Sequence, residues 1–193
     1  MNVLEADSAA LLGAIRRLLV AKNVLSEAEI AQQRQATDSA EPGQGARMVA
    51  RAWTDPAYRA LMLSDGTKAA EAMNIPMRGM PPLGVLENTQ EAHHLVVCTL
   101  CSCYPRAVLG YPPYWYKSSA YRARAVRDPR GLLAEFGTLL PEALKVRVVD
   151  SSADYRWMVL PRRPDGTDGW SAEQLAALVR PGDMLGVTVP TAP

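Results

Sequence analysis

The sequence predicts an α+β fold in which an N-terminal helical arm precedes a layered domain of helices and sheet. Residues 1–45 hold two helical patterns and then a segment rich in proline and glycine, so we assign them to the arm. Residues 46–193 combine further helical patterns with short apolar runs typical of strands, so we assign them to one domain. With 193 residues, 48% of them hydrophobic, the chain is long enough to bury a core.

The arm is predicted to contain two helices. Apolar side chains recur at helical spacing over residues 8–21. Ser26 and Glu29 have the spacing of a capping box, which predicts a second helix through about residue 37. That second helix is mostly polar, so we expect it to pack on a partner or neighbour instead of building a core alone. The segment 41–45, Glu-Pro-Gly-Gln-Gly, is predicted to be a linker.

The domain is predicted to begin with helices. Thr54 or Asp55, followed by Pro56, marks the start of one helix, and a short helix is expected over residues 66–73. Residues 76–84 are rich in proline and glycine and predict a loop, whereas residues 95–99 predict a buried strand. Two further helices are expected over residues 119–126 and 129–136, the second ended by Gly137.

The last part of the domain is predicted to be mainly sheet. Residues 145–150 and 155–160 alternate in strand fashion, so we expect them to pair with each other through a connection at residues 151–154. Ser171 and Gln174 form a second capping box, which predicts a helix to about residue 179. Residues 184–189 predict a final strand.

Charge and hydropathy exclude several classes of partner. The 21 Lys and Arg residues are balanced by 20 Asp and Glu residues, so no charge excess favours nucleic acid or a membrane surface. The first residues lack the basic stretch of a signal peptide, and no apolar run is long enough to span a membrane. We therefore expect a cytoplasmic protein whose clustered cysteines are ligands, not disulfide partners.

All three cysteines of the chain lie in one stretch of six residues, Cys98-Thr99-Leu100-Cys101-Ser102-Cys103. Cysteine binds metals as the soft thiolate, which selects zinc, copper(I), iron or cobalt. If Cys101 and Cys103 bind one ion, the amide nitrogens of Ser102 and Cys103 are brought towards it and close five- and six-membered rings. Two sulfurs and two nitrogens then form a plane, and Cys98 can cap one axial face. The remaining position is open to a substrate or to water.

Three other interpretations of these thiols are possible from the residues alone. His93 or His94 could complete a zinc or copper site. Cys98 and Cys101 could form a redox pair, although no thioredoxin-like context surrounds them. Purely structural thiols are disfavoured because close thiols form disulfides or capture metals. Deprotonated backbone amides need a strong Lewis acid, and this favours trivalent iron or cobalt for the chelate described above.

The cysteine stretch and its flanks resemble the metal claw of the nitrile hydratase α subunit. The claw itself corresponds to Val97-Cys98-Thr99-Leu100-Cys101-Ser102-Cys103-Tyr104-Pro105. The likeness continues in Val108-Leu109-Gly110, Pro112-Pro113-Tyr114-Trp115-Tyr116-Lys117, Tyr121-Arg122-Ala123-Arg124, Asp150-Ser151-Ser152, Val159-Leu160-Pro161 and Gly166-Thr167-Asp168-Gly169-Trp170. Upstream it includes Ala52-Trp53-Thr54-Asp55-Pro56 and Glu87-Asn88-Thr89. The γ subunit of thiocyanate hydrolase shares the claw, so the motif identifies the superfamily better than the substrate.

The resemblance implies a role for each residue of the claw. Cys98 would be the axial thiolate, and Cys101 and Cys103 the equatorial ligands, oxidised in the family to sulfinic and sulfenic acid respectively. Ser102 and Cys103 would supply the amide nitrogens. Thr99 stands where iron-type members have serine, which implies cobalt(III), with iron(III) as the second choice. Residues 46–193 would then be the α-like catalytic domain.

The resemblance also implies a function and partners. The chain would be the metal-bearing subunit of a hydro-lyase that adds water to a small nitrile to give the amide, with Cys103 and Cys101 in catalytic roles. It would be active only with a β-type subunit whose arginines face the oxidised sulfurs, and an activator or metallochaperone would assist assembly. The alternatives are the γ subunit of thiocyanate hydrolase, a non-catalytic cobalt carrier, and a three-subunit variant of the toyocamycin nitrile hydratase type.

Three residues, in two parts of the chain, depart from the family pattern. Arg106 and Ala107 stand where nitrile hydratases usually have Trp-Pro. Arg106 would favour an anionic or polar substrate if it faces the pocket; otherwise it faces solvent or a partner. Gly79 stands where the family often has a glutamine that donates a hydrogen bond near the claw, and Arg78 or a water is the expected substitute.

Overall fold

The computed structural model describes residues 3–38 and 40–192, and its contacts divide the chain into two compact units, Met1–Ser39 and Ala40–Pro193. The first unit consists of α1 (Val3–Ala21) and α2 (Glu27–Asp38). The predicted capping box is confirmed: the Ser26 N–H donates to Glu29 Oε2 at 2.7 Å, and the Glu29 N–H donates to Ser26 Oγ at 3.1 Å. An ion pair between Arg16 and Glu27 joins the two helices. Four large apolar side chains of α1 are exposed, namely Leu11, Leu12 (69%), Ile15 and Leu18.

The second unit contains helices and strands in alternating blocks, which confirms the α+β class. Its strands are β1 (Leu83–Glu87), β2 (Ala92–Val97), β3 (Lys145–Asp150) and β4 (Arg156–Leu160). Its helices are α3 (Pro42–Thr54), α4 (Pro56–Ser64), α5 (Gly66–Glu71), α6 (Arg106–Leu109), α7 (Tyr114–Lys117), α8 (Ser119–Arg127), α9 (Pro129–Glu135), α10 (Ala172–Leu178) and the 3₁₀ turn η1 (Asp183–Leu185).

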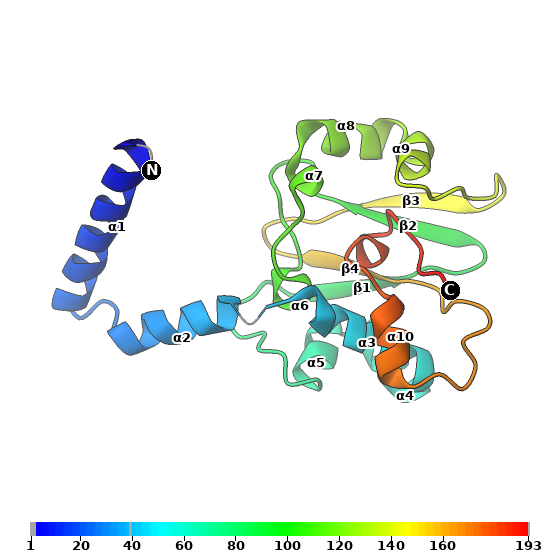
Figure 1. Cartoon of the computed structure of the whole chain (residues 1–193), viewed down its shortest axis with the longest axis horizontal. Helices are drawn as coiled ribbons and strands as arrows, with labels where there is room; N and C mark the ends of the chain where they lie inside the picture. Colours follow the sequence, from blue (N-terminus) through cyan, green and yellow to red (C-terminus); the bar gives the residue numbers. More distant parts are fainter. Residues whose placement is uncertain (1–2, 39, 193) are drawn as a thin grey trace. The chain divides into compact units, whose positions relative to one another are not determined.

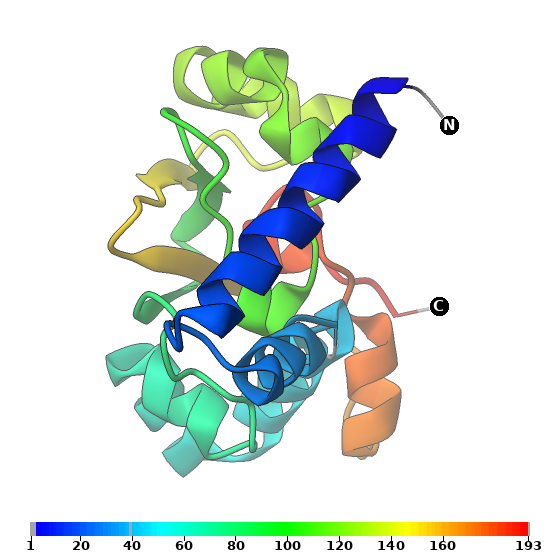
Figure 2. The ribbon, with the colours of Figure 1, turned by 90° about the vertical axis from the view of Figure 1, so that its left-hand side faces the viewer.

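The strands form a central layer covered by helices on both sides (Figures 1 and 2). β1 pairs with β4 and β2 pairs with β3, both in parallel, and β2 also contacts β4. α8 and α9 lie on one side, against β2 and β3, whereas α4 and α5 lie on the other, against β1. Because helices cover both faces, β2 is buried over its last five residues, whereas β3 mixes half-buried and exposed side chains.

Two strand predictions for the C-terminal part are wrong. Residues 145–150 and 155–160 are strands, but they do not pair with each other, because each joins an earlier strand in parallel. Residues 184–189 do not form a strand: η1 covers the start, and Gly186 has φ +77°. A Cβ at Gly186 would lie 1.8 Å from the His94 carbonyl oxygen, so the glycine is needed where η1 meets β2.

The linker prediction for residues 41–45 is also wrong, because α3 begins at Pro42. A proline is favourable in the first turn of a helix, where its missing N–H has no partner to lose. A Cβ at Gly45 would lie 2.7 Å from both Leu109 Cδ2 and Met184 Sδ. This glycine therefore permits close packing of α3 on α6 and η1 and does not signal a flexible segment.

Other local predictions are confirmed. The Asp55 side chain accepts from the Tyr58 N–H at the start of α4, and Ser171 and Gln174 form the capping box of α10. Gly137 has φ +83° just after α9. Residues 76–82 form a loop, although β1 begins at Leu83, before the predicted loop ends.

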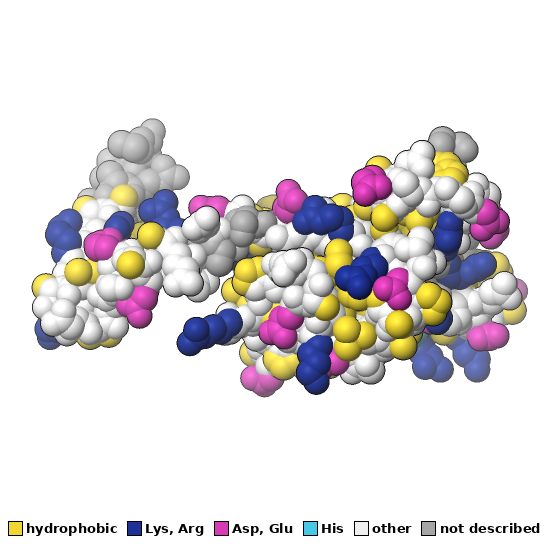
Figure 3. Space-filling view, turned by 90° about the horizontal axis from the view of Figure 1, so that it is seen from below, with side chains coloured by type: hydrophobic (Ala, Val, Ile, Leu, Met, Phe, Trp, Pro, Cys, Tyr) yellow, Lys and Arg dark blue, Asp and Glu magenta, His cyan; other side chains and the backbone are white. Residues whose placement is uncertain are grey.

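The distribution of charged and apolar side chains agrees with what the sequence predicts. On the face shown in Figure 3, Lys and Arg side chains are interspersed with Asp, Glu and apolar side chains. Over the described residues, no helix combines the length and apolar content that crossing a membrane requires.

Candidate metal centre

The cysteine loop is held by the end of β2. Leu95, Val96 and Val97 are completely buried, so the strand fixes the backbone that enters the loop at Cys98. The Tyr121 hydroxyl on α8 donates to the Val96 carbonyl at 2.6 Å. The loop then leads directly into α6, whose Val108 and Leu109 are also buried. Both ends of the loop are therefore anchored in the core.

The three cysteine sulfurs converge within this loop. Cys98 Sγ and Cys101 Sγ are 3.3 Å apart, and Cys101 Sγ and Cys103 Sγ are 3.0 Å apart. All three sulfurs lie within 4.8 Å of one another, and the described residues include no other such group of His, Cys, Asp and Glu. Cys98 and Cys103 are buried, whereas Cys101 is exposed.

The loop shifts the pKa values of two neighbouring thiols in opposite directions, down for Cys101 and up for Cys103. Hydrogen bonds from the Cys103 and Cys98 thiols lower the pKa of Cys101 to about 7, with a further contribution from the backbone N–H groups of Cys103 and Ser102. Burial, followed by the hydrogen bond with Cys101, raises the pKa of Cys103 well above that of an ordinary thiol. A second thiolate beside the first requires a compensating cation.

The donor set fits a soft or trivalent metal ion. Three sulfurs on one loop are within reach of a single ion. The N–H groups of Ser102 and Cys103 both act on the Cys101 sulfur, so these amides are directed towards the interior of the group. Thiolates and deprotonated amides are both anionic, and this favours an ion of high charge.

Neighbouring elements brace the loop at three points. The Asp150 carboxylate at the end of β3 accepts from the Thr99 N–H at 3.0 Å and from the Thr99 hydroxyl. The Tyr116 hydroxyl on α7 donates to the Cys103 carbonyl at 2.7 Å. Arg122 Nη1 on α8 donates to the Cys101 carbonyl at 3.1 Å. The loop therefore keeps its shape through backbone contacts that leave the sulfurs free for other partners.

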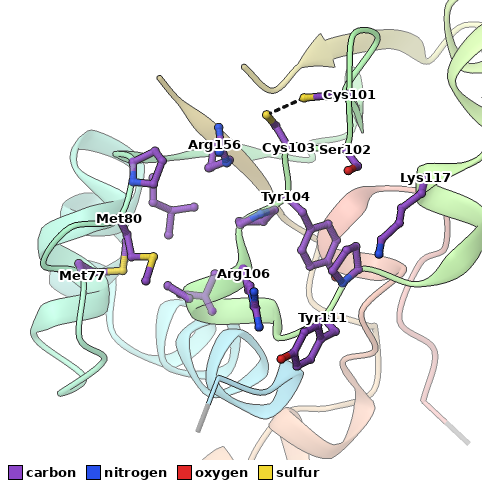
Figure 4. Close-up of a pocket in the computed structure, with 16 residues that line it drawn as sticks. Met77, Met80, Cys101, Ser102, Cys103, Tyr104, Arg106, Tyr111, Lys117 and Arg156 are labelled. Atoms are coloured by element: carbon purple, nitrogen blue, oxygen red, sulfur yellow. Dashed lines mark hydrogen bonds between the residues drawn. The ribbon is translucent and has the colours of Figure 1, made fainter. Parts of the chain in front are cut away.

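A cavity of about 470 Å³ opens beside Cys101, Ser102 and Cys103 (Figure 4). Its walls include the apolar side chains of Met77, Met80, Pro81, Leu83 and Val108. The charged residues that line it are Arg106, Lys117 and Arg156, and none of its lining residues is acidic. The cavity thus combines an apolar wall with positive charge next to the thiols.

Arg106 lies in the wall of this cavity. Its guanidinium carbon is 4.0 Å from the centre of the Tyr111 ring, a cation–π contact. Its Nε is buried and has no hydrogen-bond partner among the described residues. Gly79, in contrast, does not line the cavity, but Met77 and Met80 of the same loop do, and the proposed substitute Arg78 is exposed.

The histidines do not join the cysteine group. His93 Nε2 lies 2.7 Å from the Gly186 carbonyl oxygen, to which it donates, and His93 Nδ1 lies 3.1 Å from Asn88 Nδ2. Both ring nitrogens are therefore used within the core, and burial lowers the pKa of His93. The interpretation as a zinc or copper site completed by His93 or His94 has no support in this geometry.

Comparison with known proteins places the chain in a family. The model of the family described as nitrile hydratase, alpha chain, matches residues 6–188. The chain belongs to the nitrile hydratase α-chain family. It is 48% identical over 188 residues to the low-molecular-weight cobalt-containing nitrile hydratase subunit alpha of Rhodococcus rhodochrous, covering 97% of this chain and 91% of that one. It is 42% identical to thiocyanate hydrolase subunit gamma of Thiobacillus thioparus, covering 92% and 77% of the two chains.

Solved structures of this nitrile hydratase α-chain family share the fold. A recombinant thiocyanate hydrolase with partially modified cobalt centres superposes with a TM-score of 0.86 at 41% identity, covering 95% of this chain and 90% of that one. A double mutant of the Fe-type nitrile hydratase from Comamonas testosteroni Ni1 gives a TM-score of 0.83 at 39% identity, covering 97% and 92%. Family members therefore include both substrate types and both metals.

Proposed function

We propose that this chain is the metal-bearing subunit of a heteromeric nitrile hydratase that holds cobalt(III) and converts a nitrile to its amide. The observation that carries the proposal is the convergence of three sulfurs within 4.8 Å on one braced loop at the wall of a cavity. Cobalt is named for three relatives, at 45–48% identity, and Thr99 occupies the position that marks cobalt-type members.

Five donors would hold the ion. They are the sulfurs of Cys98, Cys101 and Cys103 and the amide nitrogens of Ser102 and Cys103. When bound, the trivalent ion supplies Lewis acidity that makes a nitrile carbon electrophilic. The relatives are subunits of larger enzymes, so we infer a β-type partner subunit, with an activator assisting metal insertion. The exposed leucines of α1 are available for packing on such a partner.

Cys103 has the central chemical role in this proposal. We infer that it carries one oxygen as a sulfenate and that Cys101 carries two as a sulfinate. In one route, a water attacks the nitrile carbon while the Cys103 sulfenate accepts its proton; the proton passes to the nitrile nitrogen, and tautomerisation of the imidic acid gives the amide. In the other route, the sulfenate oxygen attacks the nitrile carbon, and a water then attacks the sulfur, which breaks the S–O bond, releases the same imidic acid and restores the sulfenate. Tyr116 holds the Cys103 carbonyl, and the apolar wall of Met77 and Met80 limits competing water.

The amide donors can be tested by a matched pair of substitutions at one position. Ser102→Ala keeps the backbone N–H and should load cobalt as the parent chain does. Ser102→Pro removes the N–H and should lose cobalt. Elemental analysis of the complex coexpressed with its partner and activator measures the difference, and urea unfolding of the metal-free chains shows whether both variants fold. Equal cobalt in the two variants would contradict the amide ligands.

The reaction is tested on the same purified complex. Peptide mass spectrometry should find two added oxygens on Cys101 and one on Cys103, and amide should form from aliphatic, aromatic or heterocyclic nitriles. Zinc in place of cobalt, or unmodified cysteines, would refute the proposal. A cobalt-loaded complex without turnover on nitriles or thiocyanate would identify a non-catalytic cobalt carrier.

Thiocyanate hydrolase is the second candidate, and Arg106 is the observation that favours it. An arginine with a buried unpaired Nε in the cavity wall suits an anion. Replacing it by the family's usual tryptophan, Arg106→Trp, removes a charge-assisted hydrogen bond of about 1.5–3 kcal/mol. If the protein is a thiocyanate hydrolase, we expect Arg106→Trp to raise KM for thiocyanate by about 10- to 150-fold. A KM for thiocyanate that does not change, with nitriles turned over normally, favours the hydratase.

A further inference from the structure

Arg156 is the second arginine, after Arg106, that lines the cavity beside the cysteines, and the sequence motifs do not include it. It is the first residue of β4, opposite Leu83 of β1 in the parallel pairing. Its N–H donates to the Pro82 carbonyl at 2.9 Å, so its backbone position is fixed by the sheet. Its side chain lines the same cavity as Cys101 and Cys103, and Figure 4 shows it at the edge where Cys103 lies.

One nitrogen of the Arg156 guanidinium has no hydrogen-bond partner among the described residues. Its Nη1 is buried, yet none of the described residues accepts a hydrogen bond from it. Burying an unsatisfied donor costs about 1–3 kcal/mol, and more when the group is charged. Nearly all buried polar groups in proteins have a partner. An acceptor on the cavity side, either a water or a group of the metal centre, would satisfy this nitrogen.

The sulfurs are the anionic acceptors within this cavity. None of the residues that line it is acidic, so no lining carboxylate competes for Arg156. Cys101 is exposed, whereas Cys103 is 8% exposed, and Arg156 and Cys103 line the same cavity (Figure 4). A buried thiolate without a compensating cation is very unfavourable. Arg106 does not meet this need, because its guanidinium is stacked on Tyr111.

We propose that Arg156 is a positioning residue of the metal centre, whose Nη1 donates a hydrogen bond to the Cys103 sulfur or to the oxygen that this sulfur carries. This inference rests on the proposed function. It means that the chain supplies part of the positive charge facing its own claw, so the partner subunit need not supply all of it.

The test uses cobalt(II) chloride added to the metal-free full chain, followed by the thiolate-to-cobalt absorption in the near ultraviolet. We expect Arg156→Met to weaken cobalt(II) binding by about 10- to 100-fold, the usual effect of removing a residue that supports a metal ligand. Arg156→Lys keeps the charge and should restore part of the affinity. The control is Arg162→Met, an exposed arginine just after β4, which should bind as the parent chain does.

Urea unfolding of the metal-free chains separates a positioning role from a structural one. Arg156 Nη1 donates to none of the described residues, so Arg156→Met should leave the unfolding midpoint unchanged or raise it. Cobalt affinity and absorption equal to those of the parent chain would overturn the proposal, and so would a marked loss of stability in Arg156→Met. A wild-type complex that binds cobalt but hydrates no nitrile would refute the proposed function alone, because the titration does not depend on turnover.

Discussion

The hydroxyl of Tyr116 offers the sharpest test of how the core controls the claw. This side chain is completely buried, and its hydroxyl donates to the Cys103 carbonyl at 2.7 Å. Tyr116→Phe keeps the edge-to-face contact with Tyr104, whose ring centre is 5.1 Å away, and removes only the donor. The carbonyl is then left unpaired, which costs about 1–3 kcal/mol of folding free energy. For a chain of this size we expect the melting temperature to fall by roughly 2–12 °C.

The matched control for Tyr116→Phe is Tyr58→Phe. The Tyr58 hydroxyl is also buried and donates to the Ala69 carbonyl at 3.0 Å, on the far side of the domain between α4 and α5. Both variants should lose similar stability in urea titrations of the metal-free chain. Only Tyr116→Phe should loosen the claw, so iodoacetamide should alkylate Cys103 faster by about 5- to 150-fold, the equivalent of 1–3 kcal/mol of easier opening.

The alkylation rate of Cys103 and the loss of stability test two separate parts of this prediction. Equal alkylation rates of Cys103 in both variants would show that Tyr116 stabilises the fold without controlling the claw. A loss below about 0.5 kcal/mol in Tyr116→Phe would show that the Cys103 carbonyl finds another donor, and the argument from its burial would be wrong.

Three further outcomes follow from the same geometry. In the metal-free chain, the rate of Cys101 alkylation should rise with a midpoint near pH 7, whereas Cys103 should react only at higher pH. Peptide mass spectrometry measures both rates, and the same pH dependence for the two cysteines would contradict their opposite pKa shifts. Gly186→Ala should destabilise the chain by at least about 2 kcal/mol in urea, because its φ is +77° and a Cβ would collide with the His94 carbonyl. Burial lowers the pKa of His93 and of His94, so the folded chain favours neutral rings. Their contribution to stability should be complete above about pH 6.5 and be lost as the pH falls below it, so His93→Gln should flatten the change in urea midpoint between pH 7.5 and 5.5.

The convergence of the three sulfurs could be predicted from the sequence because the cysteines are local. Cys98, Cys101 and Cys103 fall within six residues, and ring closure restricts where their sulfurs and amides can lie. Helix starts such as Asp55 and Ser171 were predictable for the same reason, since a cap and its N–H partner are three residues apart.

The strand pairing was not predictable, because alternation identifies a strand without naming its neighbour. β3 and β4 follow one another with a short connection, which favours a hairpin on local grounds. In the structure each of them joins a strand that precedes it by more than fifty residues. Gly45 misled in the same way, because it is typical of a linker and yet permits a close contact of α3 with α6 and η1. Gly186 falls within a predicted strand, whereas it has φ +77° and permits a close contact with β2.

These long-range pairings explain why the surroundings of the claw were missed. Parallel pairing of β3 with β2 brings Asp150 to Thr99, and pairing of β4 with β1 brings Arg156 to the cavity beside Cys103. The three cysteines thus lie in one short stretch, whereas part of the bracing and part of the positive charge around them come from strands about fifty residues later. The relatives of this chain are named as subunits of nitrile hydratase and of thiocyanate hydrolase. We therefore expect the residues of the cavity wall, and not the claw, to determine the substrate. Arg106 is the first of these residues to exchange.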